Sequence, residues 1–174
     1  MEEPYRRQMT SYRRTRSAIL EGTKKLVASV GLQSTNMIDI ADISEVSRAT
    51  LYNHFRDKGS VLRAVLESEI ERVLLVADGE ISSAEALRRI ALEISTDQAL
   101  ERMRKSDSAV LAQLLIQRDD PLWEQVKVGL NKLLGDERVA TIARLWLVGQ
   151  MLQPLTVEQC QEQADVIVSR NSEI

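Results

Sequence analysis

Apolar residues recur along the chain at the three- and four-residue spacing of amphipathic helices, and no stretch alternates as a strand would. One apolar series begins at Ile19 and stops at Gly31, a residue type that commonly ends helices. A longer series over 62–74 predicts a helix that Asp57 caps and Gly79 ends. The first half of the chain therefore reads as helical.

Helix start signals recur at short intervals through the second half. Capping-box pairs, in which two side chains satisfy free backbone amides at a helix start, begin at Ser82 and at Thr156. At Asp120-Pro121 an aspartate precedes a first-turn proline. With the earlier series these signals predict about ten helices and no strand. We therefore expect an all-α fold.

The segment 31–58 contains two short helical patterns joined by a tight turn. The first covers 36–43, with Thr35 as its expected cap, and the second covers 48–55, with Ser47 as its cap. Two short helices joined in this way match the helix-turn-helix, whose second helix enters the major groove of DNA.

The second of these helices has one apolar face and one face suited to DNA. The residues expected to face inward are Val46, Leu51 and Phe55. The opposite, exposed face carries Arg48, Ala49, Tyr52 and Asn53. On that face Arg48 can donate two hydrogen bonds to guanine, and Asn53 can pair with adenine. The groups that can bond phosphate, and so set register without reading sequence, belong to Thr50, Tyr52 and Lys58.

Here the chain resembles the tetracycline repressor (TetR) family of bacterial transcription regulators. The matching pattern comprises Gly31 with Thr35, the pair Ile40-Ala41, the run Val46–Phe55, and then Lys58 and Leu62. It spans about 50 of the 174 residues. The family usually has glycine in the turn, where this chain has Glu45, and a non-glycine residue with positive φ costs about 1 kcal/mol.

The resemblance implies a helix-turn-helix DNA-binding domain over 1–56, joined by a long helix to a helical ligand-binding and dimerisation domain over 57–174. It implies a homodimeric repressor that binds a palindromic operator in double-stranded DNA and is released by a small-molecule effector. The DNA-binding residues expected from the pattern and the resemblance are Thr35, Ser47, Arg48, Ala49, Thr50, Tyr52, Asn53, His54 and Lys58.

The stretch 137–153 indicates a second subunit independently of the resemblance. It is apolar nearly all round, and a helix of that kind must be covered on every side. A second copy of the chain is the natural cover, and a glycine would let two helices approach closely. The residues expected at this interface are Val139, Ile142, Ala143, Trp146 and Gly149.

Composition narrows the chemistry. One histidine and one cysteine, Cys160, leave no multi-histidine or cysteine-based metal site within a chain, and we expect no metal and no cofactor. The sequence has no glycine-rich phosphate loop and no evident nucleophile–base pair, so we do not expect an enzyme. Aromatic residues are only 3%, so any effector cavity should be aliphatic. The residues expected near it are Leu74, Met103, Leu111, Leu114 and Trp123.

The net charge of −3 hides an asymmetry. Residues 1–60 hold 10 Lys/Arg against 7 Asp/Glu, and the remainder holds 13 against 19, which suits a chain whose head alone meets phosphate. The N-terminal arginines (Arg6, Arg7, Arg13, Arg14 and Arg16) form either a solvated tail or an arm on DNA. No apolar run approaches the roughly 20 residues of a membrane span, and the N-terminus is charged, so we expect a cytoplasmic protein without membrane contact.

Two alternatives stay open at this stage. His54 could be a packed surface histidine instead of a DNA-facing one. The chain could also be a ligand-sensing or protein-interaction adaptor whose helix-turn-helix head no longer binds operator DNA, with Glu45 as one symptom. A regulator would lose sequence preference in Arg48→Ala, whereas an adaptor would bind DNA weakly with or without that change.

Overall fold

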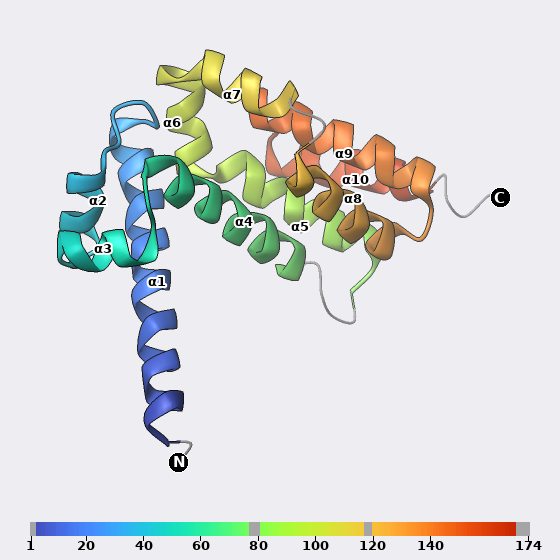
Figure 1. The fold of residues 1–174 in the computed structure, drawn as a ribbon. Helices are drawn as coiled ribbons and strands as arrows, with labels where there is room; N and C mark the ends of the chain where they lie inside the picture. The colour runs from blue at the N-terminus through green and yellow to red at the C-terminus, as the bar shows by residue number, and fades with distance from the viewer. Residues whose placement is uncertain (1–2, 77–80, 117–119, 170–174) are drawn as a thin grey trace. The chain divides into compact units, whose positions relative to one another are not determined.

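The computed structural model describes residues 3–76, 81–116 and 120–169, and every regular element in these ranges is a helix (Figure 1). The ten helices of this part of the chain are α1 (Glu3–Val30), α2 (Met37–Ile43), α3 (Arg48–His54), α4 (Lys58–Val76), α5 (Ser83–Thr96), α6 (Gln98–Ser106), α7 (Ser108–Ile116), α8 (Pro121–Leu134), α9 (Glu137–Leu152) and α10 (Val157–Ser169). The prediction of an all-α fold is confirmed.

The helix boundaries follow the start and stop signals in the sequence. The Ser82 hydroxyl accepts a hydrogen bond from the Glu85 amide at 3.2 Å, which begins α5. Thr156 and Gln159 satisfy each other's amides at 3.3 and 3.0 Å, which begins α10. Gly135 ends α8 with φ 72, in the left-handed region that glycine enters without strain. The predicted stop at Gly79 lies outside the described residues.

The chain divides into two compact units, residues 1–68 and 69–174. The core of the first unit comprises Ile19, Leu20, Leu26, Ile40, Ala41, Leu51, Phe55, Val61 and Ala64. It therefore draws on α1, α2, α3 and the start of α4. The functional division at residues 56 and 57 stays a prediction. By packing, however, the first turns of α4 belong to the first unit, because Val61 and Ala64 are buried in its core.

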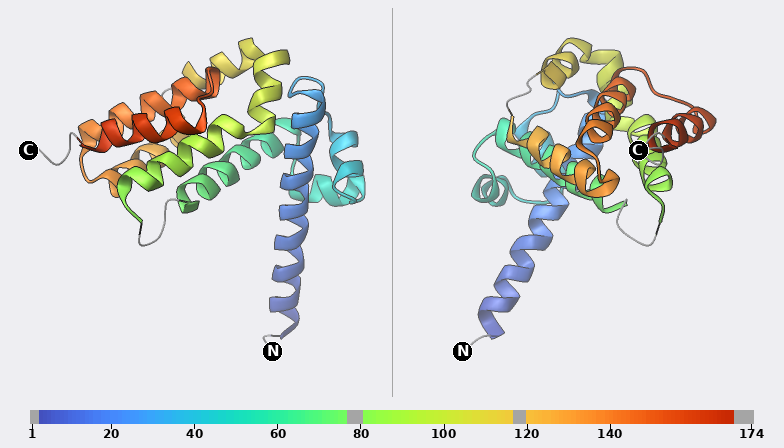
Figure 2. Two further views of the ribbon diagram at one scale, coloured as in Figure 1. Left: turned by 180° about the vertical axis from the view of Figure 1, so that it is seen from behind. Right: turned by 90° about the vertical axis from the view of Figure 1, so that its right-hand side faces the viewer.

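The first helix is longer than its apolar series alone indicated. α1 runs as one helix from Glu3 to Val30 and extends beyond α2 and α3 toward the N-terminus (Figure 2). The stretch that contains the N-terminal arginines is therefore helical, and contact of these arginines with DNA stays a prediction.

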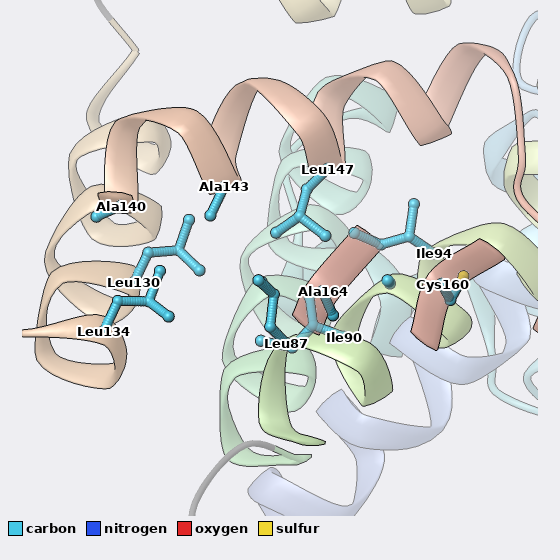
Figure 3. Packing of buried hydrophobic residues seen from close by; sticks show 11 residues of the cluster. Leu87, Ile90, Ile94, Leu130, Leu134, Ala140, Ala143, Leu147, Cys160 and Ala164 are labelled. Carbon is cyan, nitrogen blue, oxygen red and sulfur yellow. The ribbon is translucent and has the colours of Figure 1, made fainter. Parts of the chain in front are cut away.

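The core of the second unit forms where α5, α8, α9 and α10 meet. Its buried residues are Leu87, Ile90, Ala91, Ile94, Leu130, Leu134, Ala140, Ala143, Leu147, Cys160 and Ala164. Figure 3 shows Ala140, Ala143 and Leu147 of α9 pointing into this cluster. Cys160 is fully buried, and burial raises the pKa of its thiol. The prediction that it is a small core residue is confirmed.

Candidate nucleic-acid interface

α2, a tight turn and α3 form the helix-turn-helix that the sequence predicts. The turn is closed by backbone hydrogen bonds from the Glu45 amide to Asp42 O at 3.2 Å and from the Val46 amide to Ala41 O at 3.0 Å. Glu45 has φ 55 and is the one residue other than glycine with positive φ in the described part of the chain. Glu45, which stands where the family usually has glycine, thus adopts the left-handed conformation that favours glycine.

α3 presents the two faces that the sequence predicts. Ser47 caps it, because its hydroxyl accepts a hydrogen bond from the Thr50 amide at 3.0 Å. Leu51 is fully buried and Phe55, which follows the helix, is 6% exposed. The exposed residues on the other side are Arg48, Ala49, Tyr52 and Asn53. These four side chains are the ones that α3 offers to a partner.

Thr35 does not cap α2, contrary to the prediction. The side-chain oxygen of Asn36 caps α2 by accepting hydrogen bonds from the Ile38 and Asp39 amides, each at 3.0 Å. Thr35 is 1% exposed, and its hydroxyl donates to Gly31 O at 2.8 Å. Its hydroxyl therefore ties the loop to the end of α1.

Three other side chains predicted to contact DNA hold hydrogen-bond partners inside the first unit. The Ser47 and Thr50 hydroxyls lie 2.8 Å apart. The Lys58 ammonium donates to Gln33 O at 3.0 Å and joins the start of α4 to the loop before α2. These bonds fix the backbone around α3, and the proposed phosphate contacts of these residues stay predictions.

His54 packs against α1. Its ring stacks on the ring of Tyr12, with the centroids 4.2 Å apart and the planes 29° apart. Burial and the Arg16 guanidinium lower the pKa of the His54 imidazole from its ordinary value of 6.5. Arg16 also lies over Phe55, with its guanidinium carbon 5.3 Å from the ring centroid. Of the two readings of His54, this geometry matches the packed histidine.

Tyr12 and Arg16 were missed in the sequence as partners of α3. The available signal was weak, because their four-residue spacing places two side chains on one helix face without showing which helix they meet.

The five residues predicted for dimerisation do not share one face of α9. Ala143 is fully buried in the core of its own chain, so the prediction that it lies at an interface is wrong. Val139 and Trp146 are partly buried against that core, and the Trp146 indole N–H donates to Gln163 Oε1 at 2.6 Å. Ile142 is 56% exposed, and the side of Gly149 opens to free space.

A groove of about 540 Å³ lies between α8 and α9. Its lining comprises Asp120, Pro121, Trp123, Glu124, Lys127, Glu137, Ala140, Thr141 and Arg144. It is strongly charged, and Trp123 alone of the residues expected near an aliphatic cavity lines it. Met103 and Leu111 are buried, and Leu114 is 38% exposed.

Residues 3–76, 81–116 and 120–169 contain no group of three or more His, Cys, Asp or Glu side chains that could hold a metal ion. None of their helices combines the length and apolarity needed to cross a membrane.

The helix-turn-helix and the helices that flank it match a known family. Residues 19–65 match the family model described as bacterial regulatory proteins, tetR family. The HTH-type transcriptional regulator TtgR of Pseudomonas putida is 24% identical over 111 residues, which are 61% of this chain and 53% of that protein. The chain thus spans about half the length of the curated relatives it matches.

Solved structures extend the likeness over most of the chain. The TetR family repressor AlkX from Dietzia sp., implicated in biodegradation of n-alkanes, has a TM-score of 0.66 and 16% identity. The likeness covers 90% of this chain and 97% of that one. The transcriptional regulator SCO7518 from Streptomyces coelicolor has a TM-score of 0.64 and 20% identity, over 89% and 98% of the two chains. These likenesses show the fold.

Proposed function

Because the chain belongs to the TetR family of bacterial regulatory proteins, we propose that it is a DNA-binding transcription regulator with α3 as its recognition helix. The observation that carries the proposal is the division of α3 into a buried face and an exposed face. Leu51 holds the helix in the core, while Arg48 and Asn53 project from the other side. A regulator of this kind is not an enzyme and works on the chromosome, which places it in the bacterial cytoplasm.

In this proposal some exposed residues of α3 recognise DNA bases, and others bind phosphates and so position the helix on the DNA. Arg48 reads guanine and Asn53 reads adenine, each bidentate pair contributing about 1–3 kcal/mol of discrimination. Ala49 is small enough for close approach of a base edge. Tyr52 bonds a phosphate, which sets register without reading sequence. The fixed backbone around Ser47 and Lys58 supports this arrangement.

The proposal includes a homodimer formed through α9 and α10. Support comes from apolar side chains that are exposed on these two helices, namely Ile142, Leu145, Leu152, Val157 and Val166. Two copies related by a two-fold axis place two recognition helices on half-sites about 34–36 Å apart, which makes the operator an approximate palindrome.

The dimer proposal has a direct test. Ile142→Glu should convert the dimer to a monomer in analytical ultracentrifugation. Val128→Glu is the matched control, because Val128 is 60% exposed on α8, a helix that is not part of the proposed interface. A dimer that survives Ile142→Glu refutes this interface.

The regulator is proposed to act as a repressor that a small molecule releases from DNA. Release requires that the effector bind one of two dimer states more tightly than the other. The scarcity of aromatic residues favours an effector with an aliphatic bound part, and the charged groove between α8 and α9 is not proposed as its site. Decanoate is a suitable soluble probe, and the expected result is a lower affinity for the operator when it is present.

The test of the main proposal is fluorescence anisotropy with DNA that flanks the protein's own gene, at about 50 and 200 mM salt and with random DNA as competitor. A dimer with roughly 6–10 phosphate contacts should lose about 10³–10⁵ in affinity over that range. It should prefer its own fragment by at least about 10³. If binding is weak and without preference, and a genome-wide fragment selection is also empty, the adaptor becomes the better account.

A pair of arginine variants separates recognition of DNA bases from the non-specific attraction of a positive charge to DNA. Arg48→Ala should abolish the preference for the operator. Arg56→Ala, an exposed arginine just beyond α3, removes the same charge and should weaken binding to both kinds of DNA alike. Equal loss of preference in both variants contradicts the role of Arg48.

A further inference from the structure

We propose that Tyr12 and Arg16 of α1 are positioning residues for the recognition helix. They hold the two rings at its C-terminal end, His54 and Phe55, and so set the orientation of the side chains that face DNA. The consequence for DNA rests on the proposed function of α3. We call the contacts of Tyr12 and Arg16 with His54 and Phe55 the clamp. The clamp does not depend on the proposed function, because it is a feature of the free protein.

The four side chains form a continuous row of contacts. Tyr12 stacks on His54 with 4.2 Å between ring centroids, and the rings of His54 and Phe55 are 6.4 Å apart. Arg16 closes the row with its guanidinium 5.3 Å from the centroid of Phe55. Stacked rings and a cation over a ring are both attractive arrangements. Two residues one turn apart on α1 thus grip two successive residues at the end of α3.

The end of α3 depends on such packing because the helix is short. It has seven residues, and helices of this length are not stable alone in water. Its start is fixed by the Ser47 cap, and Leu51 anchors its middle. Asn53 directly precedes His54, so a rotation of the helix end would move the side chain proposed to read adenine.

Phe55 belongs to the core of the first unit, whereas Tyr12 lies outside it. Tyr12 is 47% exposed, so its removal takes little apolar surface from the interior. His54 Nδ1 is buried and has no hydrogen-bond partner among the described residues. No hydrogen bond through Nδ1 places the ring, and the stack on Tyr12 is the contact that α1 gives it. This separates an effect on orientation from an effect on folding.

The first arm of the test is NMR of the free protein. The chain has one histidine, so the imidazole signals belong to His54 without further assignment. Tyr12→Ala should remove the ring-current shift of these signals and move the pKa of His54 toward 6.5. Tyr12→Phe keeps the ring and should preserve both. If the His54 signals are the same in Tyr12→Ala and in the parent protein, the clamp is refuted.

The second arm measures binding to a DNA fragment selected by the parent protein, against random DNA. Tyr12→Ala should reduce the preference about 2- to 10-fold, the size expected for loss of one aromatic pair, and Tyr12→Phe should restore it. Arg16→Ala should reduce preference as well. Arg13→Ala removes an equal charge from an exposed position of α1; any loss of affinity should be the same for both DNAs, and the preference should stay intact.

The two arms separate the possible failures. Changed His54 signals with an unchanged DNA preference show that the clamp exists but positions nothing, which overturns the proposal. Equal effects of Arg13→Ala and Arg16→Ala assign the loss to charge and also overturn it. If the parent protein has no preferred DNA, the proposed function fails, and the NMR arm still decides whether Tyr12 holds the end of α3.

Discussion

The left-handed residue in the helix-turn-helix gives a prediction that depends on one backbone angle. Glu45 has φ 55, a conformation that costs a residue with a side chain about 1–2 kcal/mol and costs glycine almost nothing. The turn cannot relax easily, because the Glu45 and Val46 amides are both hydrogen-bonded. Glu45→Gly should relieve the strain, while Glu45→Ala should keep it.

Comparison of these two variants isolates the strain, because both remove the carboxylate from an exposed site. Glycine also adds freedom to the unfolded chain, which offsets about 0.4–1 kcal/mol of the gain. The glycine variant should therefore be more stable than the alanine variant by about 1 kcal/mol.

Urea unfolding of the full chain, followed by circular dichroism, measures this difference. If the alanine variant is instead the more stable one by about 0.4–1 kcal/mol, only the freedom of the unfolded chain distinguishes the two variants, the positive φ carries no cost and the reasoning is wrong. Glu45→Gln adds a separate measurement, since it removes the charge and keeps the size. Its affinity for DNA should exceed that of the parent protein at low salt, and the advantage should shrink as salt rises.

Four further predictions concern stability. Ser47→Ala removes the cap of α3 and should lower the free energy of unfolding by about 1 kcal/mol, measured by urea titration. Gly129→Ala gains the same helix propensity as Gly149→Ala but places a Cβ 2.7 Å from a methyl group of Leu74, which must shift, so it should be less stable than Gly149→Ala in the same assay. Gly149→Ala meets nothing within 4 Å and should stabilise the single chain by about 1 kcal/mol, yet weaken the dimer in ultracentrifugation if two helices approach closely there. Burial and a nearby guanidinium lower the pKa of His54 in the folded state, which favours the neutral imidazole there. The contribution of His54 to the free energy of unfolding should therefore be fully present above pH 6.5 and be lost as the pH falls through the lowered pKa. The difference in the free energy of unfolding between the parent protein and His54→Gln, followed from about pH 7.5 to 5.5, measures this contribution.

The elements that the sequence predicts correctly are those with local causes. A cap such as Asp120 or a left-handed glycine such as Gly135 acts within one helical turn, so its effect is legible from adjacent residues. The two faces of α3 follow from the same logic, because the spacing of Leu51 and Phe55 fixes the inward side and leaves Arg48 outside.

The predictions from the sequence are wrong where a contact joins segments that lie far apart in the chain. An apolar helix such as α9 must be covered, but the pattern does not divide its covered sides between its own chain and a second one. The core of the same chain takes Ala143, while Ile142 beside it stays exposed. His54 matched a family pattern on the recognition helix, but its partner Tyr12 lies 42 positions earlier, beyond the reach of any local spacing.

The polar residues engaged inside the first unit bear on how α3 would bind DNA under the proposed function. Ser47, Thr50 and Lys58 already hold partners within the chain, so a phosphate that approaches them has to share or replace those hydrogen bonds. Their contribution is then chiefly preorganisation, since a backbone fixed before binding loses less conformational freedom on binding. The direct gain falls to the side chains of Arg48, Tyr52 and Asn53, which are exposed. The expected consequence is a recognition surface in which few residues read DNA and many hold those few in place.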